Sequence, residues 1–196
     1  MYPAPRVDFF FFIGSLYSYL SVMRVGEAAR RAGVQVRWRP FNLRAIMIEQ
    51  NNIPRNHPVK MKYAWHDVER RARRHGLPFK AGMPYPVDPD GLANRVAVVA
   101  ADAGWCEQYA AATYRAWFVD HQAPGDPARI LASLGHPEAL AQAQASEARR
   151  RFDDETDAAR RLGIFGAPTF VVRDEIFWGD DRLEDALENA RGRSPV

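Results

Sequence analysis

Cysteine is almost absent from this chain. Cys106 is the single cysteine among 196 residues, which excludes an intramolecular disulfide and a cysteine-rich metal site. Redox chemistry at a reactive centre would therefore have to use a sulfur atom from another molecule. The low cysteine content also gives no reason to expect an oxidising compartment, so we expect a cytoplasmic protein.

Long apolar segments and a large charge excess are also missing. The apolar run at residues 7–13 is too short to span a bilayer, so we expect no membrane partner. The net charge of +3, from 27 basic and 24 acidic residues, is too small to indicate general nucleic-acid binding. Three histidines at positions 57, 66 and 75 are nine residues apart, a spacing that predicts no metal site.

Lysine is scarce and confined to one segment. All three lysines lie within residues 55–80, where eight basic residues accompany two acidic ones. Such a segment either attracts a small anionic ligand or forms a solvated helix face.

The order of the predicted elements indicates an α/β protein. A strand at residues 7–13, a helix at 16–32 and a strand at 34–41 form a β-α-β unit. Strand signals then vanish until about residue 155, and helical segments are predicted at 44–50, 58–75, 92–104, 107–121, 127–134 and 137–153. A helix ending near residue 162, a strand hairpin at 169–172 and 176–178, and a helix with an acidic cap at Asp181 complete the chain.

This order is that of a thioredoxin-like fold with a large all-helical insertion between its β-α-β and α-β-β-α halves. We expect residues 1–42 and 156–196 to form the thioredoxin-like domain, and residues 43–155 to form the inserted helical domain. The proline-rich stretch at 78–89 can only be a loop. Within that loop, Tyr85 is the candidate for contact with a substrate.

Two segments carry residues with chemical potential. In a thioredoxin-like fold the reactive group lies where the first strand meets the first helix, and here that position reads Gly14-Ser15-Leu16-Tyr17-Ser18. A Ser-x-x-Ser pattern cannot exchange disulfides, and no Gly-x-Ser-x-Gly elbow supports a hydrolase nucleophile. Ser15 could cap the helix, donate a hydrogen bond to a thiolate from another molecule, or do both.

The second segment is Gly166-Ala167-Pro168-Thr169, a proline directly before a predicted strand. Most X–Pro bonds are trans. In a thioredoxin-like setting we instead expect a cis-proline loop that faces the reactive helix and offers its backbone to an extended peptide such as glutathione.

Several motifs in this order resemble the 2-hydroxychromene-2-carboxylate isomerases, which are relatives of the kappa-class glutathione transferases within the DsbA-like branch. The match covers about residues 7–187. The motifs are Phe11-Phe12-Ile13-Gly14-Ser15-Leu16-Tyr17-Ser18-Tyr19-Leu20, Arg39-Pro40-Phe41, Asn52 with Pro54, Gly163-Ile164-Phe165-Gly166-Ala167-Pro168-Thr169 and Phe177-Trp178-Gly179-Asp180-Asp181-Arg182.

The resemblance implies a glutathione site. Ser15 would lie beside the glutathione sulfur, and Leu16 and Tyr17 would continue the same helix start. The resemblance also implies that the backbone at Ala167, before Pro168, pairs with the cysteinyl part. The remaining implied contacts are Asp180 and Asp181 at the γ-glutamyl end and Asn52 nearer the other arm, and Lys60 falls near a lysine of the family pattern.

Two positions depart from the family pattern. Leu16 stands where the family usually has proline, so the helix start lacks a fixed φ angle. Asp180 stands where a smaller uncharged residue is common, and two adjacent carboxylates attract an ammonium group but repel a carboxylate.

The activity implied by the resemblance is a glutathione-dependent isomerisation. A thiolate held by Ser15 would add reversibly to an aromatic keto acid or its cyclic form, in aromatic catabolism. The expected partners are a small aromatic carboxylate and a second copy of the chain in a homodimer. Two alternatives are a kappa-like glutathione transferase or peroxidase and a non-catalytic thioredoxin-like binding protein.

Overall fold

The structure is a computed structural model that describes residues 4–53, 56–81 and 87–192. Its sheet has four strands in the order β2-β1-β3-β4. They are β1 (Arg6–Phe11), β2 (Gln35–Pro40), β3 (Thr169–Val172) and β4 (Glu175–Trp178). β1 pairs in parallel with β2 and antiparallel with β3, and β3 and β4 form the predicted antiparallel hairpin. The prediction of a thioredoxin-like α/β fold is confirmed.

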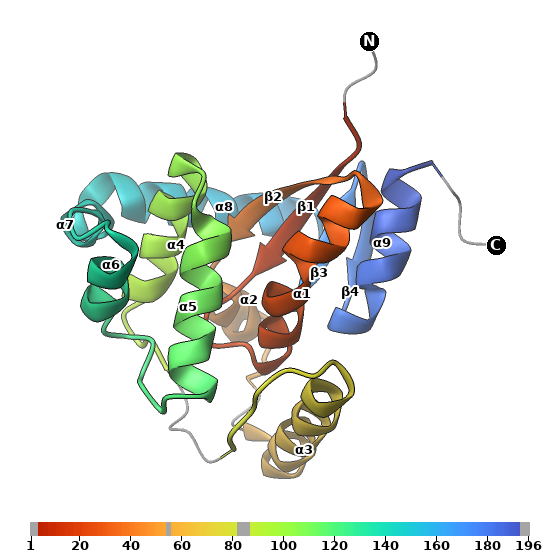
Figure 1. Ribbon diagram of the computed structural model, residues 1–196, viewed down its shortest axis with the longest axis horizontal. Coiled ribbons are helices and arrows are strands. Elements are labelled where there is room, and N and C mark those ends of the chain that lie inside the picture. Colours follow the sequence, from red (N-terminus) through yellow and green to blue (C-terminus); the bar gives the residue numbers. More distant parts are fainter. Residues whose placement is uncertain (1–3, 54–55, 82–86, 193–196) are drawn as a thin grey trace.

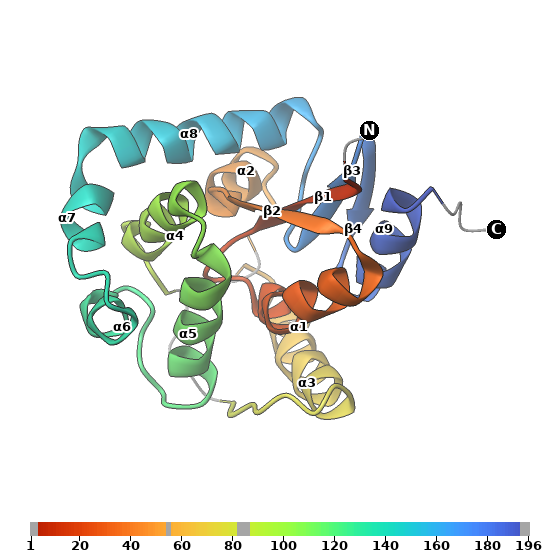
Figure 2. The same ribbon diagram turned by 45° about the horizontal axis from the view of Figure 1, so that its top comes forward.

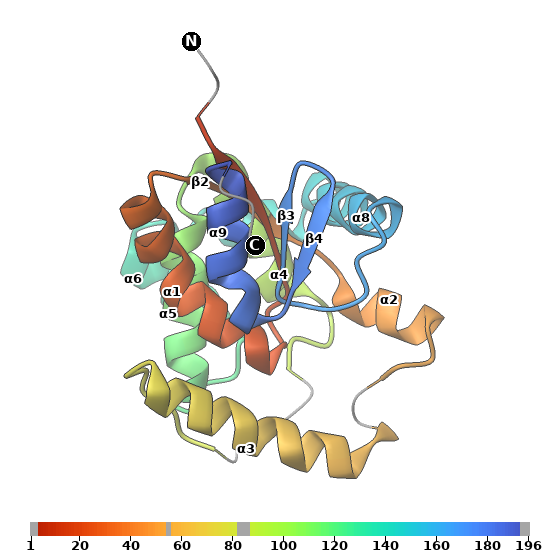
Figure 3. The same cartoon turned by 90° about the vertical axis from the view of Figure 1, so that its right-hand side faces the viewer.

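Helices cover both faces of this sheet. α1 (Leu16–Ala32) and α9 (Leu183–Ala190) lie on one face, and α2 (Leu43–Glu49) and α8 (Ser146–Arg161) lie on the other (Figures 1 and 3). β1 is therefore buried on both faces, as its nearly continuous apolar sequence predicts. Phe9 and Phe11 join the larger hydrophobic cluster, while Phe10 joins the smaller cluster on the opposite face.

The remaining helices occur between β2 and β3 in the sequence. They are α3 (Pro58–Arg74), α4 (Leu92–Ala103), α5 (Cys106–Phe118), α6 (Ala128–Leu134) and α7 (Ala139–Gln144). α4 to α7 pack beside the β2 edge of the sheet, whereas α3 crosses one end of the molecule below α1 (Figures 1 and 3). The larger hydrophobic cluster contains residues of the sheet, α1, α4 and α5.

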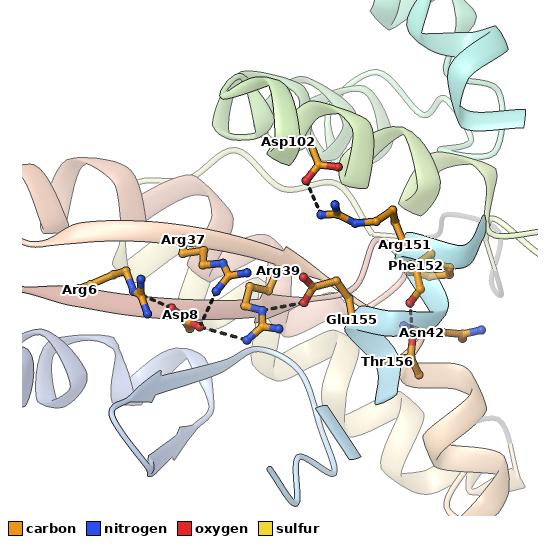
Figure 4. Close-up of polar contacts among 10 residues, drawn as sticks. All are labelled: Arg6, Asp8, Arg37, Arg39, Asn42, Asp102, Arg151, Phe152, Glu155 and Thr156. Atoms are coloured by element: carbon orange, nitrogen blue, oxygen red, sulfur yellow. Dashed lines mark hydrogen bonds and ion pairs between the residues drawn. The ribbon is translucent and has the colours of Figure 1, made fainter. Parts of the chain in front are cut away.

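α8 connects these helices to the sheet. Arg39 of β2 donates to Glu155 of α8 at 2.6 Å and to Asp8 of β1 at 3.1 Å. Arg151, one turn earlier on α8, pairs with Asp102 of α4 at 2.6 Å (Figure 4). Figure 2 shows α8 running along α2 and α4. The predicted domain boundary at residue 155 falls inside α8, and the division into two domains stays a prediction.

Two element predictions near the C-terminus are corrected. The predicted helix 137–153 is divided, because Ala145 has an extended backbone with ψ 154° and separates α7 from α8. A 3-10 turn, η2 (Asp180–Arg182), precedes α9, so the predicted acidic cap at Asp181 lies inside that turn. Among the described residues, no helix combines the length and the apolar character needed to cross a membrane.

Candidate functional site

Ser15 lies at the turn from β1 into α1. Its backbone N–H donates to the Phe12 carbonyl at 2.9 Å, which closes a turn through Gly14. Gly14 has φ +133°, a conformation that favours glycine. Ser15 is the N-cap of α1, and its hydroxyl oxygen accepts the Ser18 N–H at 3.2 Å. The capping role suggested by the sequence is therefore present.

The same hydroxyl also contacts the proline loop. The Ala167–Pro168 peptide bond is cis, as expected for a thioredoxin-like fold. The Ser15 hydroxyl donates to the Ala167 carbonyl at 2.9 Å, although the two residues are 152 positions apart in sequence. The fold thus brings the two predicted segments into direct contact at the positive end of the α1 dipole.

A cavity of about 680 Å³ opens beside this contact. Its walls come from the Ser15 turn, α2, the start of α3, residues 165–167 and the end of β4. Every charged or titratable side chain among the described lining residues, other than Tyr17, is basic: Arg44, His57 and Lys60. The apolar lining side chains include Phe12, Leu16, Leu43, Met47, Ile48, Ile53, Met61, Phe165 and Trp178.

The structure gathers six of the predicted site residues around this cavity. They are Ser15, Leu16, Tyr17, Asn52, Lys60 and Ala167. Pro168 directly follows Ala167 but does not line the cavity, and Tyr85 lies outside the described residues. Their placement agrees with a common site, and their individual roles stay predictions.

Asp180 and Asp181 lie in different surroundings, and their expected contact with the γ-glutamyl end stays a prediction. Asp180 is only 2% exposed, and one of its carboxylate oxygens accepts from Nε and Nη2 of Arg71 at 2.9 and 2.6 Å. Burial raises the pKa of Asp180, and Arg71 opposes that rise. Asp181 is exposed and pairs with Arg182 at 3.4 Å. Neither residue lines the cavity.

Tyr17 links the cavity to α3. Its hydroxyl donates to the Asp67 carboxylate at 3.0 Å. Burial, with a further contribution from Asp67, raises the pKa of Tyr17 well above its ordinary value. Tyr17 is therefore a neutral phenol at physiological pH, and its hydroxyl connects α1 to α3.

Sequence reasoning missed several lining residues. Arg44 extends over the Phe12 ring at 5.6 Å and donates to the carbonyls of Val87, Asp88 and Pro89 at 2.8 to 3.3 Å. Positions 44, 47 and 48 lie on one helix face, and this spacing in the sequence could have indicated that the three side chains share one surface. The side chains of Phe165 and Trp178 are exposed, and their rings meet edge to face at 4.8 Å. No comparable spacing in the sequence predicts this contact.

Comparisons with known proteins agree with this geometry. The family model of the DSBA-like thioredoxin domain matches residues 6–190. A 2-hydroxychromene-2-carboxylate isomerase of Pseudomonas sp. (strain C18) is 32% identical over 200 residues, covering 97% of this chain and 92% of that protein. A protein of the same name from Sphingobium xenophagum is 30% identical over 191 residues, covering 93% and 96%.

A solved structure of a 2-hydroxychromene-2-carboxylate isomerase also superposes on this chain. The TM-score is 0.83 at 29% identity, with 96% of this chain and 95% of that chain covered. The match in sequence and in structure thus extends over nearly the whole molecule. This chain therefore belongs to the DsbA-like thioredoxin-domain family and, within it, to the family of the 2-hydroxychromene-2-carboxylate isomerases.

Proposed function

We propose that this chain isomerises 2-hydroxychromene-2-carboxylate, or a closely related aromatic carboxylate, with glutathione as its cofactor. The names of the relatives support the reaction. The observation that carries the proposal is the Ser15 hydroxyl, which lies at the N-terminus of α1 against the carbonyl before a cis proline. This group borders a cavity with an apolar lining and basic charged side chains.

The cavity has groups that match several parts of glutathione. Glutathione is an extended peptide with a thiol, two carboxylates and an ammonium group, and the first two of these use a donor for the sulfur and nearby cations, while the peptide uses backbone partners. The Ala167 backbone, the Ser15 hydroxyl and Lys60 would supply them. When bound, glutathione contributes a thiolate, a nucleophile that adds reversibly to a conjugated carbonyl.

Ser15 and α1 would stabilise that thiolate. A free thiol has a pKa of about 8.5, and a helix N-terminus lowers it. The Ser15 hydroxyl has one proton, which it now donates to the Ala167 carbonyl at 2.9 Å. If this hydroxyl rotated toward the glutathione thiolate, a charged sulfur would replace the neutral Ala167 carbonyl as its acceptor. The hydrogen bond would then be stronger.

The other walls would bind the aromatic substrate. Ile48, Phe165 and Trp178 line the cavity although they remain at least 42% exposed. Covering these side chains with an aromatic ring would remove apolar surface from water. The basic side chains among the lining residues would attract the substrate carboxylate.

The test compares two serine variants. Ser15→Ala removes the donor, whereas Ser18→Ala removes a fully buried hydroxyl that has no hydrogen-bond partner among the described residues. The isomerisation is followed by ultraviolet absorbance with and without glutathione. We expect Ser15→Ala to lower kcat roughly 100-fold, as for other donors to a developing charge, and Ser18→Ala to retain activity.

Other results would contradict the proposal. Isomerisation that proceeds equally well without glutathione, or that survives in Ser15→Ala, would exclude the proposed role of Ser15. Turnover of an aryl halide without isomerisation would favour a transferase, and failure to bind glutathione by calorimetry would favour a binding protein.

The homodimer and the cytoplasmic location belong to the same proposal. The homodimer follows from the family resemblance, and the cytoplasmic location follows from the single cysteine, which is buried. Light scattering of the purified chain tests the dimer, because a monomer mass at micromolar concentration would contradict it.

A further inference from the structure

The inserted helices hold the backbone of the reactive turn. Asn94, in the first turn of α4, pairs with both backbone groups of Ile13, although it is 81 positions distant. The Ile13 N–H donates to Asn94 Oδ1 at 2.8 Å, and Asn94 Nδ2 donates to the Ile13 carbonyl at 2.9 Å. Asn94 is 0% exposed. The Asn94 amide thus pairs with the Ile13 backbone beyond the end of β1, as the backbone of a neighbouring strand would do.

Asp88 fixes the orientation of the Asn94 amide. The second Nδ2 proton of Asn94 donates to Asp88 Oδ2 at 2.8 Å. The backbone N–H groups of Ala93 and Asn94 also donate to the Asp88 carboxylate, at 3.0 and 3.2 Å. A rotated Asn94 amide would turn its oxygen toward this carboxylate, so only the observed orientation satisfies both partners.

Tyr114 of α5 holds the other part of the turn. Its hydroxyl lies 2.8 Å from the Phe12 carbonyl and 3.1 Å from the Ser15 carbonyl. Tyr114 is 0% exposed, and its contact with the Phe12 carbonyl is buried, so water does not compete for that acceptor. Together, Asn94 and Tyr114 contact the backbone at Phe12, Ile13 and Ser15.

We propose that Asn94 and Tyr114 are positioning residues for Ser15. The inserted helices would thereby determine where the Ser15 hydroxyl and the first N–H groups of α1 point. This inference rests on the proposed role of Ser15 as the group that holds the glutathione sulfur. Within the turn itself, the Ser15 N–H to Phe12 carbonyl bond spans Gly14, whose backbone is intrinsically permissive. The contacts from Asn94 and Tyr114 therefore restrict the backbone conformations that this turn can adopt.

The test uses two tyrosines of the same helix. Tyr114→Phe removes the hydroxyl at the turn. Tyr109→Phe is the matched control, because Tyr109 is also 0% exposed on α5 and donates to the Ala93 carbonyl at 3.1 Å, away from the turn. Three quantities are measured: the pKa of bound glutathione from thiolate absorbance, kcat with KM, and amide hydrogen exchange at Ile13 and Ser15 without glutathione.

We expect Tyr114→Phe to raise the pKa of the bound thiol, to lower kcat by roughly tenfold, and to accelerate exchange at the turn. Tyr109→Phe should leave these three quantities at the wild-type values, even though the loss of its hydrogen bond to Ala93 lowers the melting temperature. Asn94→Ala should act like Tyr114→Phe. If Asn94→Ala fails to fold, the comparison of the two tyrosine variants still decides the question.

The two proposals fail in distinguishable ways. If the wild type lowers the pKa of bound glutathione but Tyr114→Phe behaves like Tyr109→Phe, the positioning role is wrong and the role of Ser15 stands. If the wild type leaves that pKa unchanged, the role of Ser15 is wrong, and the positioning of Ser15 for catalysis falls with it. Unchanged exchange at the turn in Tyr114→Phe would overturn the positioning role in either case.

Discussion

At the scale of single residues, Arg71 changes what Asp180 can do. The carboxylate is buried at 2% exposure, and Arg71 contacts one of its oxygens through two nitrogen atoms. A buried charge of this kind is stable only while it is paired. Asp180 therefore joins η2 to α3, and it is not free to bind a ligand ammonium group without releasing Arg71.

Arg71→Met should destabilise the protein. Removing one partner of a buried pair costs about 3–5 kcal/mol, and we expect the lower end because the Arg71 side chain is 26% exposed. Urea unfolding at neutral pH measures this change. Arg73→Met is the control, because Arg73 lies on the same helix and its side chain is 77% exposed in a pair with Glu69.

The loss of unfolding free energy in Arg71→Met should depend on pH. Burial already raises the pKa of Asp180, and Arg71 opposes the rise, so the pKa is higher still without Arg71. A carboxyl group whose pKa is raised by folding destabilises the folded state at high pH and regains stability as pH falls through that raised pKa. The difference from the wild type should shrink in mildly acidic solution. A difference that grows toward acid would contradict this account.

At the scale of elements, α3 is attached through both apolar and polar contacts. Val68 and Ala72 are its only buried side chains among those described. Met61, Ala64 and Trp65 are partly buried and also pack against the larger hydrophobic cluster. The polar attachments include the Tyr17 to Asp67 hydrogen bond and the Arg71 to Asp180 pair. Because the start of α3 forms one wall of the cavity, these contacts determine the shape of the site.

Tyr17→Phe should therefore weaken ligand binding more than chemistry. It removes the bond to Asp67 but leaves the ring against the cavity. We expect KM to rise a few-fold with kcat nearly unchanged, the pattern of a lost binding contact. The control is Tyr63→Phe, since Tyr63 lies on α3, is 60% exposed and does not line the cavity. A loss of kcat with unchanged KM would contradict this role of Tyr17.

At the scale of the whole molecule, one hydrophobic cluster joins the sheet to the inserted helices. It includes Phe9 of β1, Val96 of α4 and Tyr109 of α5. α8 adds the polar contacts to Arg39 and Asp102 (Figure 4). The thioredoxin-like part and the helical insertion therefore share their buried surfaces.

We expect a single cooperative unfolding transition. Scanning calorimetry should give one peak whose van't Hoff and calorimetric enthalpies agree, because neither part can expose the shared core alone. Two resolved peaks would show that residues 43–155 unfold as an independent domain.

The predictions made from sequence are most accurate where the signal is local. The Ser15 cap, the 16–32 helix that ends before Gly33, and the 169–178 hairpin all depend on neighbouring residues. The break at Ala145 and the η2 turn were missed. Nothing in the alanine-rich sequence around Ala145 signals a break.

The order of strands and helices and the apolar pattern of β1 were sufficient to determine the fold class and the two segments that meet at the site. The tertiary structure alone decided that Arg71 neutralises Asp180, that Arg44 lines the cavity, and that Asn94 and Tyr114 hold the reactive turn. The contacts of Arg71 with Asp180, of Asn94 with Ile13 and of Tyr114 with Phe12 join residues about 80 to 110 positions apart. Periodicity and capping act within a few residues, whereas such pairs form only when packing of the whole core brings their elements together.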